Sequence, residues 1–216
     1  VCNSHYKMLQ YVHGPLLCTC ILLPIPGESV VQRDLKASER KMHMLIQEIR
    51  MRYPNPKHTF TGSAKNLSLL DAIDQEICKS NIEAIIIGTQ GSTDATEVSF
   101  GNNTIHIMEE VAGCPILAIP SHVSFTELKE VVLASGFKTA PQEQELFFIK
   151  KVLKRTKAVL RILYVDEHGG LEEGQEENKK ILQDLLKDVN YTFHTLAYLS
   201  VPIGIYCFTE SRGSDM

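Results

Sequence analysis

AIIIGTQG (residues 84–91) and, nine residues further on, GNNT (residues 101–104) decide the fold class of this chain. The run from Ala84 to Ile87 is apolar at every position, which is typical of a parallel strand buried on both faces in an α/β protein. Gly88 and Gly91 lack a Cβ, so the backbone can turn sharply there and approach a ligand closely. The stretch therefore predicts a strand, then a glycine loop, then the start of a helix.

A helix start that faces a glycine loop favours phosphate binding. The first backbone N–H groups of a helix have no partner within the helix, and the positive end of its dipole lies there. The stretch has neither the Lys-Ser or Lys-Thr of a P-loop nor the glycine spacing of the dinucleotide fingerprint. The alternative is that the glycines serve only as turns in an α/β fold that binds no nucleotide.

The spacing Gly88-x2-Gly91-x9-Gly101, followed by VAGCPILAIP at residues 111–120, resembles the signature of the universal stress protein family. Members of that family usually have Ser or Thr after the third glycine, where this chain has Asn102. An Asn side chain can still cap the helix and donate to a phosphate. The resemblance implies a doubly wound parallel sheet of the flavodoxin-like, adenine-nucleotide-binding type, present as two tandem repeats.

The resemblance also implies a ligand and a role. It assigns the phosphates of ATP or another adenine nucleotide, accompanied by Mg²⁺, to Gly88, Thr89, Gly91, Gly101, Asn102, Asn103 and Thr104. The implied role is a sensor or switch in the stress response, with at most slow ATP hydrolysis or autophosphorylation, because the sequence shows no nucleophile with its base. The alternative is a dimerisation or interaction module of the same fold that binds no nucleotide. A third alternative is an enzyme, such as a synthetase or an electron-transfer flavoprotein subunit. This chain is short for such an enzyme, which needs additional substrate-binding machinery.

Strands alternate with helices in both halves, which predicts a parallel sheet covered by helices. In chain order, the first half predicts a helix over 1–12, a strand over 16–23, a helix over 30–53, a strand over 57–61, a helix from a cap at Asn66 to about Ser80, a strand over 84–87, a helix over 102–112 and a strand over 115–119. The second half predicts a strand over 129–134, a helix from Pro141 through Leu153, a strand over 159–165, a helix over 172–189, a strand over 191–196 and a short helix over 203–208.

Two domains of the family type are expected, residues 1–120 and 127–216. The first matches the family without its first strand, which is central in such a sheet, so we expect a gap in the core unless something else supplies that strand. The second domain matches a truncated copy of the family's domain. The family's adenosine-binding Asp falls at Gly136, so this copy is expected to be structural. Members of the family pair their last strands, which makes Ile116–Ile119 the expected pairing edge in a homodimer or between the two domains.

Composition narrows the class of partners. The 216 residues are 44% apolar and 22% charged, an ordinary globular balance. The net charge of −4 offers no general attraction to nucleic acid or to an anionic membrane, and no apolar run is long enough to span a bilayer. The six cysteines show no CxxC pair and no zinc-like spacing. We therefore expect a cytoplasmic protein with no nucleic-acid partner, no membrane partner and no protein-bound metal site.

Overall fold

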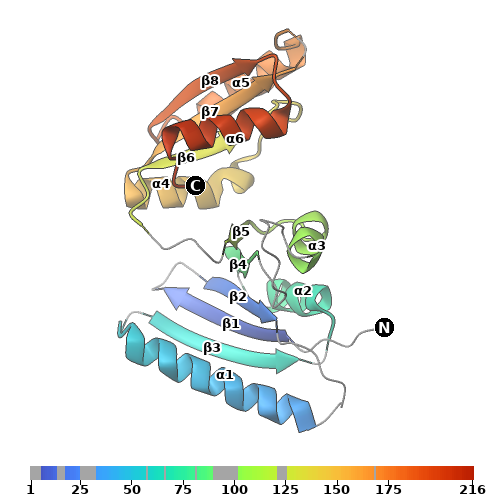
Figure 1. Cartoon of the computed structure of the whole chain (residues 1–216), viewed down its shortest axis with the longest axis vertical. Helices are drawn as coiled ribbons and strands as arrows, with labels where there is room; N and C mark the ends of the chain where they lie inside the picture. Colours follow the sequence, from blue (N-terminus) through green and yellow to red (C-terminus); the bar gives the residue numbers. More distant parts are fainter. Residues whose placement is uncertain are drawn as a thin grey trace. The chain divides into compact units, whose positions relative to one another are not determined.

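The computed structural model describes residues 6–13, 18–24, 33–56, 58–65, 67–80, 82–89, 102–120, 126–167 and 169–216; the side chains of 6–13, 18–24, 33–35, 102 and 103 are outside this description. The chain divides into two compact units, Val1–Val123 (unit 1) and Ser124–Met216 (unit 2). Both units combine helices with parallel strands (Figure 1), so the expected α/β class is confirmed.

Unit 1 contains one five-stranded sheet in the order β3-β1-β2-β4-β5. Its elements in chain order are β1 (Tyr6–His13), β2 (Cys18–Pro24), α1 (Arg33–Arg52), β3 (His58–Lys65), α2 (Leu69–Lys79), β4 (Ala84–Gly88), α3 (Asn102–Glu110) and β5 (Ile116–Ile119). β2 pairs in parallel with β4, and β4 pairs in parallel with β5. These three strands bring their carboxyl ends to the same edge of the sheet.

The expected helix over residues 1–12 is wrong, because this segment contains the strand β1. β1 pairs antiparallel with β2 on one side and with β3 on the other. Tyr6, Leu9 and Val12 have a helical spacing, but a short apolar run can also form a strand. Pairing with two neighbours satisfies the backbone N–H and C=O groups of the segment on both sides, and such tertiary pairing overrides a weak local preference.

The expected gap at the centre of the sheet is not found among the described strands. β2 pairs directly with β4, with Thr19 opposite Ala84 and Leu22 opposite Ile87. The extra strand β1 lies between β2 and β3, rather than between β2 and β4. β4 is therefore a central strand with hydrogen-bonded neighbours on both sides, as its apolar sequence predicts.

The helices of unit 1 are fixed to the sheet by buried apolar side chains. α2 and α3 share one cluster with β4, whose fully or nearly buried members are Leu69, Ile73, Ile85, Ile87, Ile107 and Cys114. α1 packs on β3 through Met42, Ile46 and Phe60. The first of these clusters matters for function, because it sets the position of α3 relative to the carboxyl end of β4.

Helix α2 begins later than expected. Its N-cap is Ser68 rather than Asn66, and the Ser68 hydroxyl accepts a hydrogen bond from the backbone N–H of Asp71 at 3.1 Å. The apolar helical period starts at Leu69, so the cap that immediately precedes it is the effective one. Asp71 in the first turn also suits the positive end of the helix dipole.

Unit 2 contains three parallel strands in the order β6-β7-β8. Its elements in chain order are β6 (Glu130–Ala134), α4 (Glu143–Thr156), β7 (Val159–Asp166), α5 (Glu173–Leu185), β8 (Tyr191–Ala197) and α6 (Val201–Arg212). One face of the sheet packs on α4 and α5 around Leu160 and Ile162. The other face packs on α6 around Leu163 and Val165. In Figure 1, α6 accordingly lies across one face of this sheet.

Two helices of unit 2 differ in length from the prediction. α5 ends at Leu185, and the expected remainder to residue 189 is a turn after the C-cap Leu186. α6 runs from Val201 to Arg212, twice the length of the expected helix over 203–208. It starts at the N-cap Ser200 with a proline in its first turn, and it ends at Gly213, whose φ of +60° suits glycine.

Helix α4 carries several basic side chains, and two of them make contacts within unit 2. Lys150 donates to the Leu185 carbonyl at 2.7 Å and forms an ion pair with Asp188 at 3.0 Å. Lys154 forms a second ion pair with the same carboxylate. These contacts place positive charge at the C-terminal end of α5, where the helix dipole favours it. Two of the basic side chains therefore join α4 to α5.

Candidate functional site

The connectivity of unit 1 marks one place on its sheet where a ligand is expected. From β2 the chain passes through α1 to β3, on one side of β2 in the sheet, whereas from β4 it passes through α3 to β5, on the opposite side. The connections therefore diverge between β2 and β4. In open α/β sheets, ligands bind in the crevice outside the carboxyl ends of the two strands at such a switch point. Here these ends are Pro24 and Gly88.

Two hydrogen bonds fasten the neighbouring elements to the end of β4. The Thr104 hydroxyl, in the first turn of α3, donates to the carbonyl of Gly88 at 3.1 Å. The backbone N–H of Thr89 donates to the carbonyl of Ile119, at the end of β5, at 3.1 Å. Both threonine side chains are buried. The start of α3 and the ends of β4 and β5 therefore form one fixed corner.

Gly88 leaves open space at this corner. Among the residues that the structure describes, a Cβ added to it would meet no other atom within 4 Å, and Gly88 itself is exposed. The first turn of α3 contains no acidic residue. A phosphate near this helix start would thus meet the positive end of a helix dipole without a carboxylate from that turn to repel it.

The structure places five of the seven predicted site residues. It brings Gly88, Thr89 and Thr104 together, and it puts Asn102 and Asn103 at the first two positions of α3. Gly91 and Gly101 lie outside the described residues. Because Thr104 is buried and bonded to the Gly88 carbonyl, it positions the helix start and does not offer its hydroxyl to the crevice.

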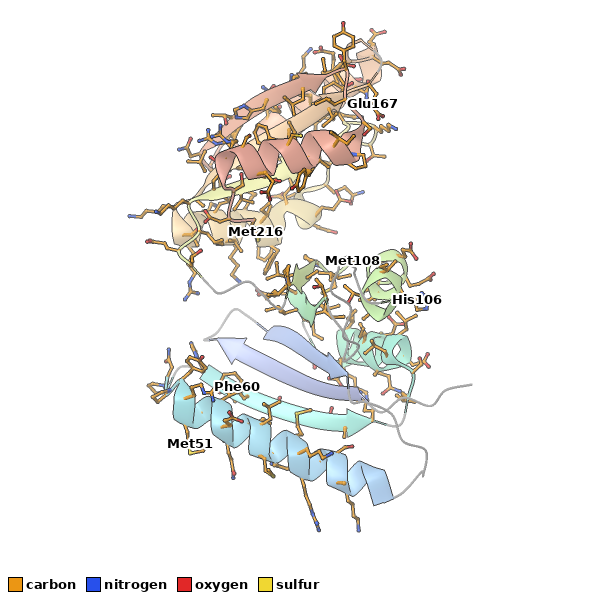
Figure 2. All side chains as sticks on the ribbon, viewed as in Figure 1. Met51, Phe60, His106, Met108, Glu167 and Met216 are labelled. Atoms are coloured by element: carbon orange, nitrogen blue, oxygen red, sulfur yellow. The ribbon has the colours of Figure 1, made fainter. Side chains whose placement is uncertain are left out.

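His106 is the nearest titratable side chain further along α3. It is exposed, as is Met108 on the same helix (Figure 2). A histidine early in the helix that follows a glycine loop could be a surface residue or lie near a phosphate, and the exposure of His106 favours the surface interpretation. Among the residues that the structure describes, no group of three or more His, Cys, Asp or Glu side chains is placed to hold a metal ion.

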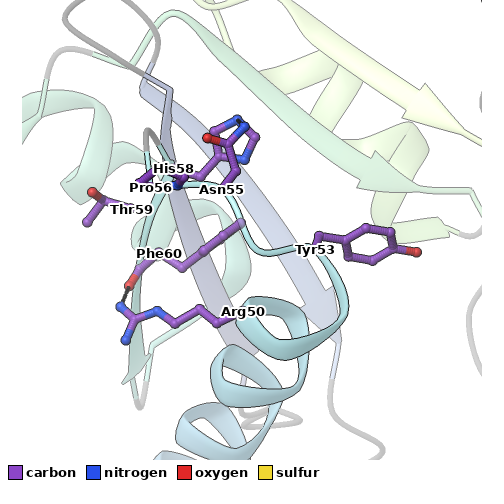
Figure 3. Close-up of a pocket in the computed structure, with 7 residues that line it drawn as sticks. All are labelled: Arg50, Tyr53, Asn55, Pro56, His58, Thr59 and Phe60. Carbon is purple, nitrogen blue, oxygen red and sulfur yellow. Dashed lines mark hydrogen bonds between the residues drawn. The ribbon is translucent and has the colours of Figure 1, made fainter.

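A separate hollow of about 310 Å³ lies between the end of α1 and the start of β3 (Figure 3). Its polar groups bond to the chain itself: Arg50 donates to the Phe60 carbonyl at 3.1 Å, and the Asn55 amide lies 3.0 Å from the His58 ring. Tyr53 points away from these groups in the close-up. The hollow is therefore best explained as part of the packing of α1 on β3.

The corresponding edge of unit 2 is occupied by the chain's own side chains. The carbonyl of Gly136, after β6, accepts from the Gln175 amide at 2.7 Å, and the next carbonyl, of Phe137, accepts from Asn178 at 2.9 Å. Asp166, at the end of β7, is buried and accepts from the N–H of Gly169 at 2.7 Å. This edge offers less open backbone than the corner at Gly88.

The bond between Thr104 and Gly88 leads to a stability prediction. Thr104→Val keeps the shape of the side chain but removes the donor, so the Gly88 carbonyl loses this partly buried hydrogen bond. We expect the free energy of unfolding to fall by about 1 kcal/mol, measured by urea denaturation. Thr59→Val, the same change at an exposed position of β3, is the control and should change it by less than about 0.5 kcal/mol. An unchanged stability in Thr104→Val would mean that this bond does not hold α3 in place.

In the part of the chain that is described, no helix has both the length and the apolar character needed to cross a membrane. The chain matches no protein-family model, and neither a curated protein nor a solved structure resembles it significantly.

Proposed function

We propose that unit 1 binds the phosphates of an adenine nucleotide, such as ATP, at the corner formed by the end of β4 and the start of α3. The observation that carries the proposal is the bond from Thr104 to the Gly88 carbonyl, which fixes a helix N-terminus beside the switch point of the sheet. The open space at Gly88 supports it, because a ligand atom can approach the backbone there.

The ligand set follows the resemblance to universal stress proteins. Gly88, Thr89, Gly91, Gly101, Asn102, Asn103 and Thr104 form or position the phosphate loop. Mg²⁺ would be held chiefly by phosphate oxygens and water, which is its usual mode with nucleotides. Unit 2 is the structural half of a tandem, flavodoxin-like pair in this proposal, since the groups at its corresponding edge bond to one another.

The role we propose is that of a cytoplasmic stress-response sensor. A bound nucleotide would stabilise the segment between β4 and α3, and the loaded and empty states would differ in the surface they present. The competing function is an interaction module that pairs through the edge strand β5 and binds no nucleotide. One side of β5 pairs with β4, and Ile119 at its end is exposed, which is compatible with pairing through β5 in either case.

Gly88→Val is the sharpest test of nucleotide binding. A Cβ at this position meets no atom of the described residues within 4 Å, so we expect the fold to tolerate valine, which suits a strand. It would, however, fill the space that a phosphate needs. We expect wild-type protein to bind Mg-ATP in calorimetric titration, and Gly88→Val to bind at least about 100-fold more weakly, a loss of about 3 kcal/mol, with little change in melting temperature.

Gly174→Val in unit 2 is the matched control, because a Cβ there also meets nothing within 4 Å. It should leave the affinity for Mg-ATP unchanged. Mass spectrometry of small molecules released from denatured wild-type protein gives an independent measurement. If wild-type protein neither carries an adenine nucleotide nor binds Mg-ATP, the competing interaction module is favoured.

A further inference from the structure

Helix α6 is apolar on its outer side as well as on the side that packs on the sheet. Its inner side is formed by Gly204 and Phe208, both buried against β7. On the outer side, Ile203 and Tyr206 expose 54% and 65% of their surface. A helix that is apolar all round is normally buried on all sides. The outer side of α6 is therefore unusual for a surface helix.

The outer residues form a continuous stripe. Ile203, Tyr206, Cys207 and Glu210 are spaced by three, four and seven residues, which puts them on one face of the helix, opposite Gly204 and Phe208. We call these four residues the outer stripe. All are exposed, and the Cys207 thiol is free. Just before the helix, Tyr198 adds a further exposed aromatic ring.

The stripe and its surroundings are large enough for a specific contact. From their exposed fractions, Tyr198, Leu199, Ile203 and Tyr206 together expose about 500 Å², taking about 200 Å² for a fully exposed large side chain. Two copies in contact would then remove about 1,000 Å² from water, which is the lower limit for a specific interface, before any rim residues are counted. The largest apolar patch on a typical monomer spans about 300–600 Å² and is often functional.

The distribution of charge favours a second copy of this chain as the occupant. Residues 198–209 contain no charged side chain, so two copies can meet without opposing like charges. Glu210 lies near the C-terminal end of α6, and at the other end the Glu167 carboxylate of the same chain accepts from the backbone N–H of Val201 at 3.2 Å. If two α6 helices pack antiparallel about an axis near Tyr206 and Cys207, Glu210 of each copy comes opposite Ile203 of the other, so the two Glu210 carboxylates are kept apart.

We propose that the outer stripe of α6 is a homodimer interface, in which two copies pack antiparallel about a two-fold axis near Tyr206 and Cys207. Such an isologous contact uses the same patch on both subunits. This interface lies in unit 2 and differs from pairing through β5, and it does not depend on nucleotide binding by unit 1.

Tyr206→Glu tests the interface. It places a charge in the centre of the stripe on both copies, and we expect the dimer dissociation constant to rise by about 100-fold or more, as for a central aromatic anchor. The measurement is sedimentation equilibrium of the full chain across a range of concentrations. Phe147→Glu on α4 is the matched control, because Phe147 is also an exposed aromatic residue of unit 2. It should leave the dimer intact, and both variants should keep the wild-type melting temperature.

Cys207 supplies a second readout. Near the two-fold axis, the two thiols should form an intersubunit disulfide when copper–phenanthroline accepts their two electrons. The linked dimer should persist in Cys78→Ser, which removes the exposed thiol of α2, and should disappear in Cys207→Ser. A monomeric wild-type chain would overturn the proposal. So would a dimer that survives in Tyr206→Glu, or one that Phe147→Glu weakens equally.

Discussion

Gly204→Ala is expected to lower the free energy of unfolding by about 2 kcal/mol, although replacing glycine by alanine inside a helix normally raises it by about 0.5–1 kcal/mol. The cause is the close approach of α6 to β7. A Cβ on Gly204 would lie 2.8 and 2.9 Å from the two γ-carbons of Val165. Valine is branched at Cβ and stiff, so it cannot turn away as the end of a long side chain could. Helix α6 would have to move off the sheet.

Two further variants isolate this cause, with stability measured by urea denaturation. Gly174→Ala is the matched helical control: its Cβ meets nothing within 4 Å, so stability should rise by a few tenths of a kcal/mol. Val165→Ala removes the two obstructing methyl groups and alone should cost about 1.5–2 kcal/mol. In the double variant the two losses should not add, because alanine at 165 makes room for alanine at 204. Additive losses would contradict the proposed clash.

The sequence predicted the order of strands and helices well from β2 onward, because apolar periodicity and turn residues are local signals. The prediction failed at β1, because this eight-residue segment fits both the helical and the strand period. Only its pairing with the two neighbouring strands selects the strand. The full length of α6 could have been recognised, since Ser200 before a proline and Gly213 at the end are standard start and stop signals. The need for Gly204 in the close approach of α6 to β7 could not have been recognised, because Val165 lies far away in the sequence.

At the candidate site too, local patterns were predictable from the sequence and tertiary contacts were not. The glycine spacing placed Gly88 and Thr104 in one motif. It did not predict the hydrogen bond between them, which makes Thr104 a positioning residue. No motif indicated the ion-pair network around Glu130 in unit 2 either. Its partners Arg161 and Arg212 are 31 and 82 residues away along the chain. Such contacts depend on the tertiary fold and leave no local pattern.

Replacement of Glu130 is the second change with a large expected effect. Its carboxylate accepts from Arg161 at 2.8 Å, from Arg212 at 2.6 and 2.9 Å and from Ser214 at 3.0 Å, and its side chain is only 16% exposed. Glu130→Gln keeps the size but removes the charge, leaving two guanidinium groups close together without their counter-ion. Because Arg212 is partly exposed and solvent screens part of the effect, we expect a loss of about 2 kcal/mol in the free energy of unfolding.

The effect of this change should depend on pH in a defined direction. Chiefly through its hydrogen bonds to Arg212, folding lowers the pKa of Glu130 from 4.5 to about 2. A carboxyl with a lowered pKa stabilises the fold fully above its unfolded pKa and loses that contribution as the pH falls toward its folded pKa. The stability difference between wild type and Glu130→Gln should therefore shrink from about 2 kcal/mol near pH 6 to almost nothing near pH 2.

Urea denaturation of both proteins across this pH range measures the difference directly. The pKa of Asp188 is also lowered to about 2 by Lys154 and Lys150, but that group is present in both proteins and cancels in the comparison. Glu127→Gln, which removes an exposed carboxylate three residues before Glu130, should change stability by less than about 0.5 kcal/mol throughout. A difference for Glu130→Gln that stayed constant with pH would mean that the loss comes from side-chain shape, and not from the charge that joins β6, β7 and α6.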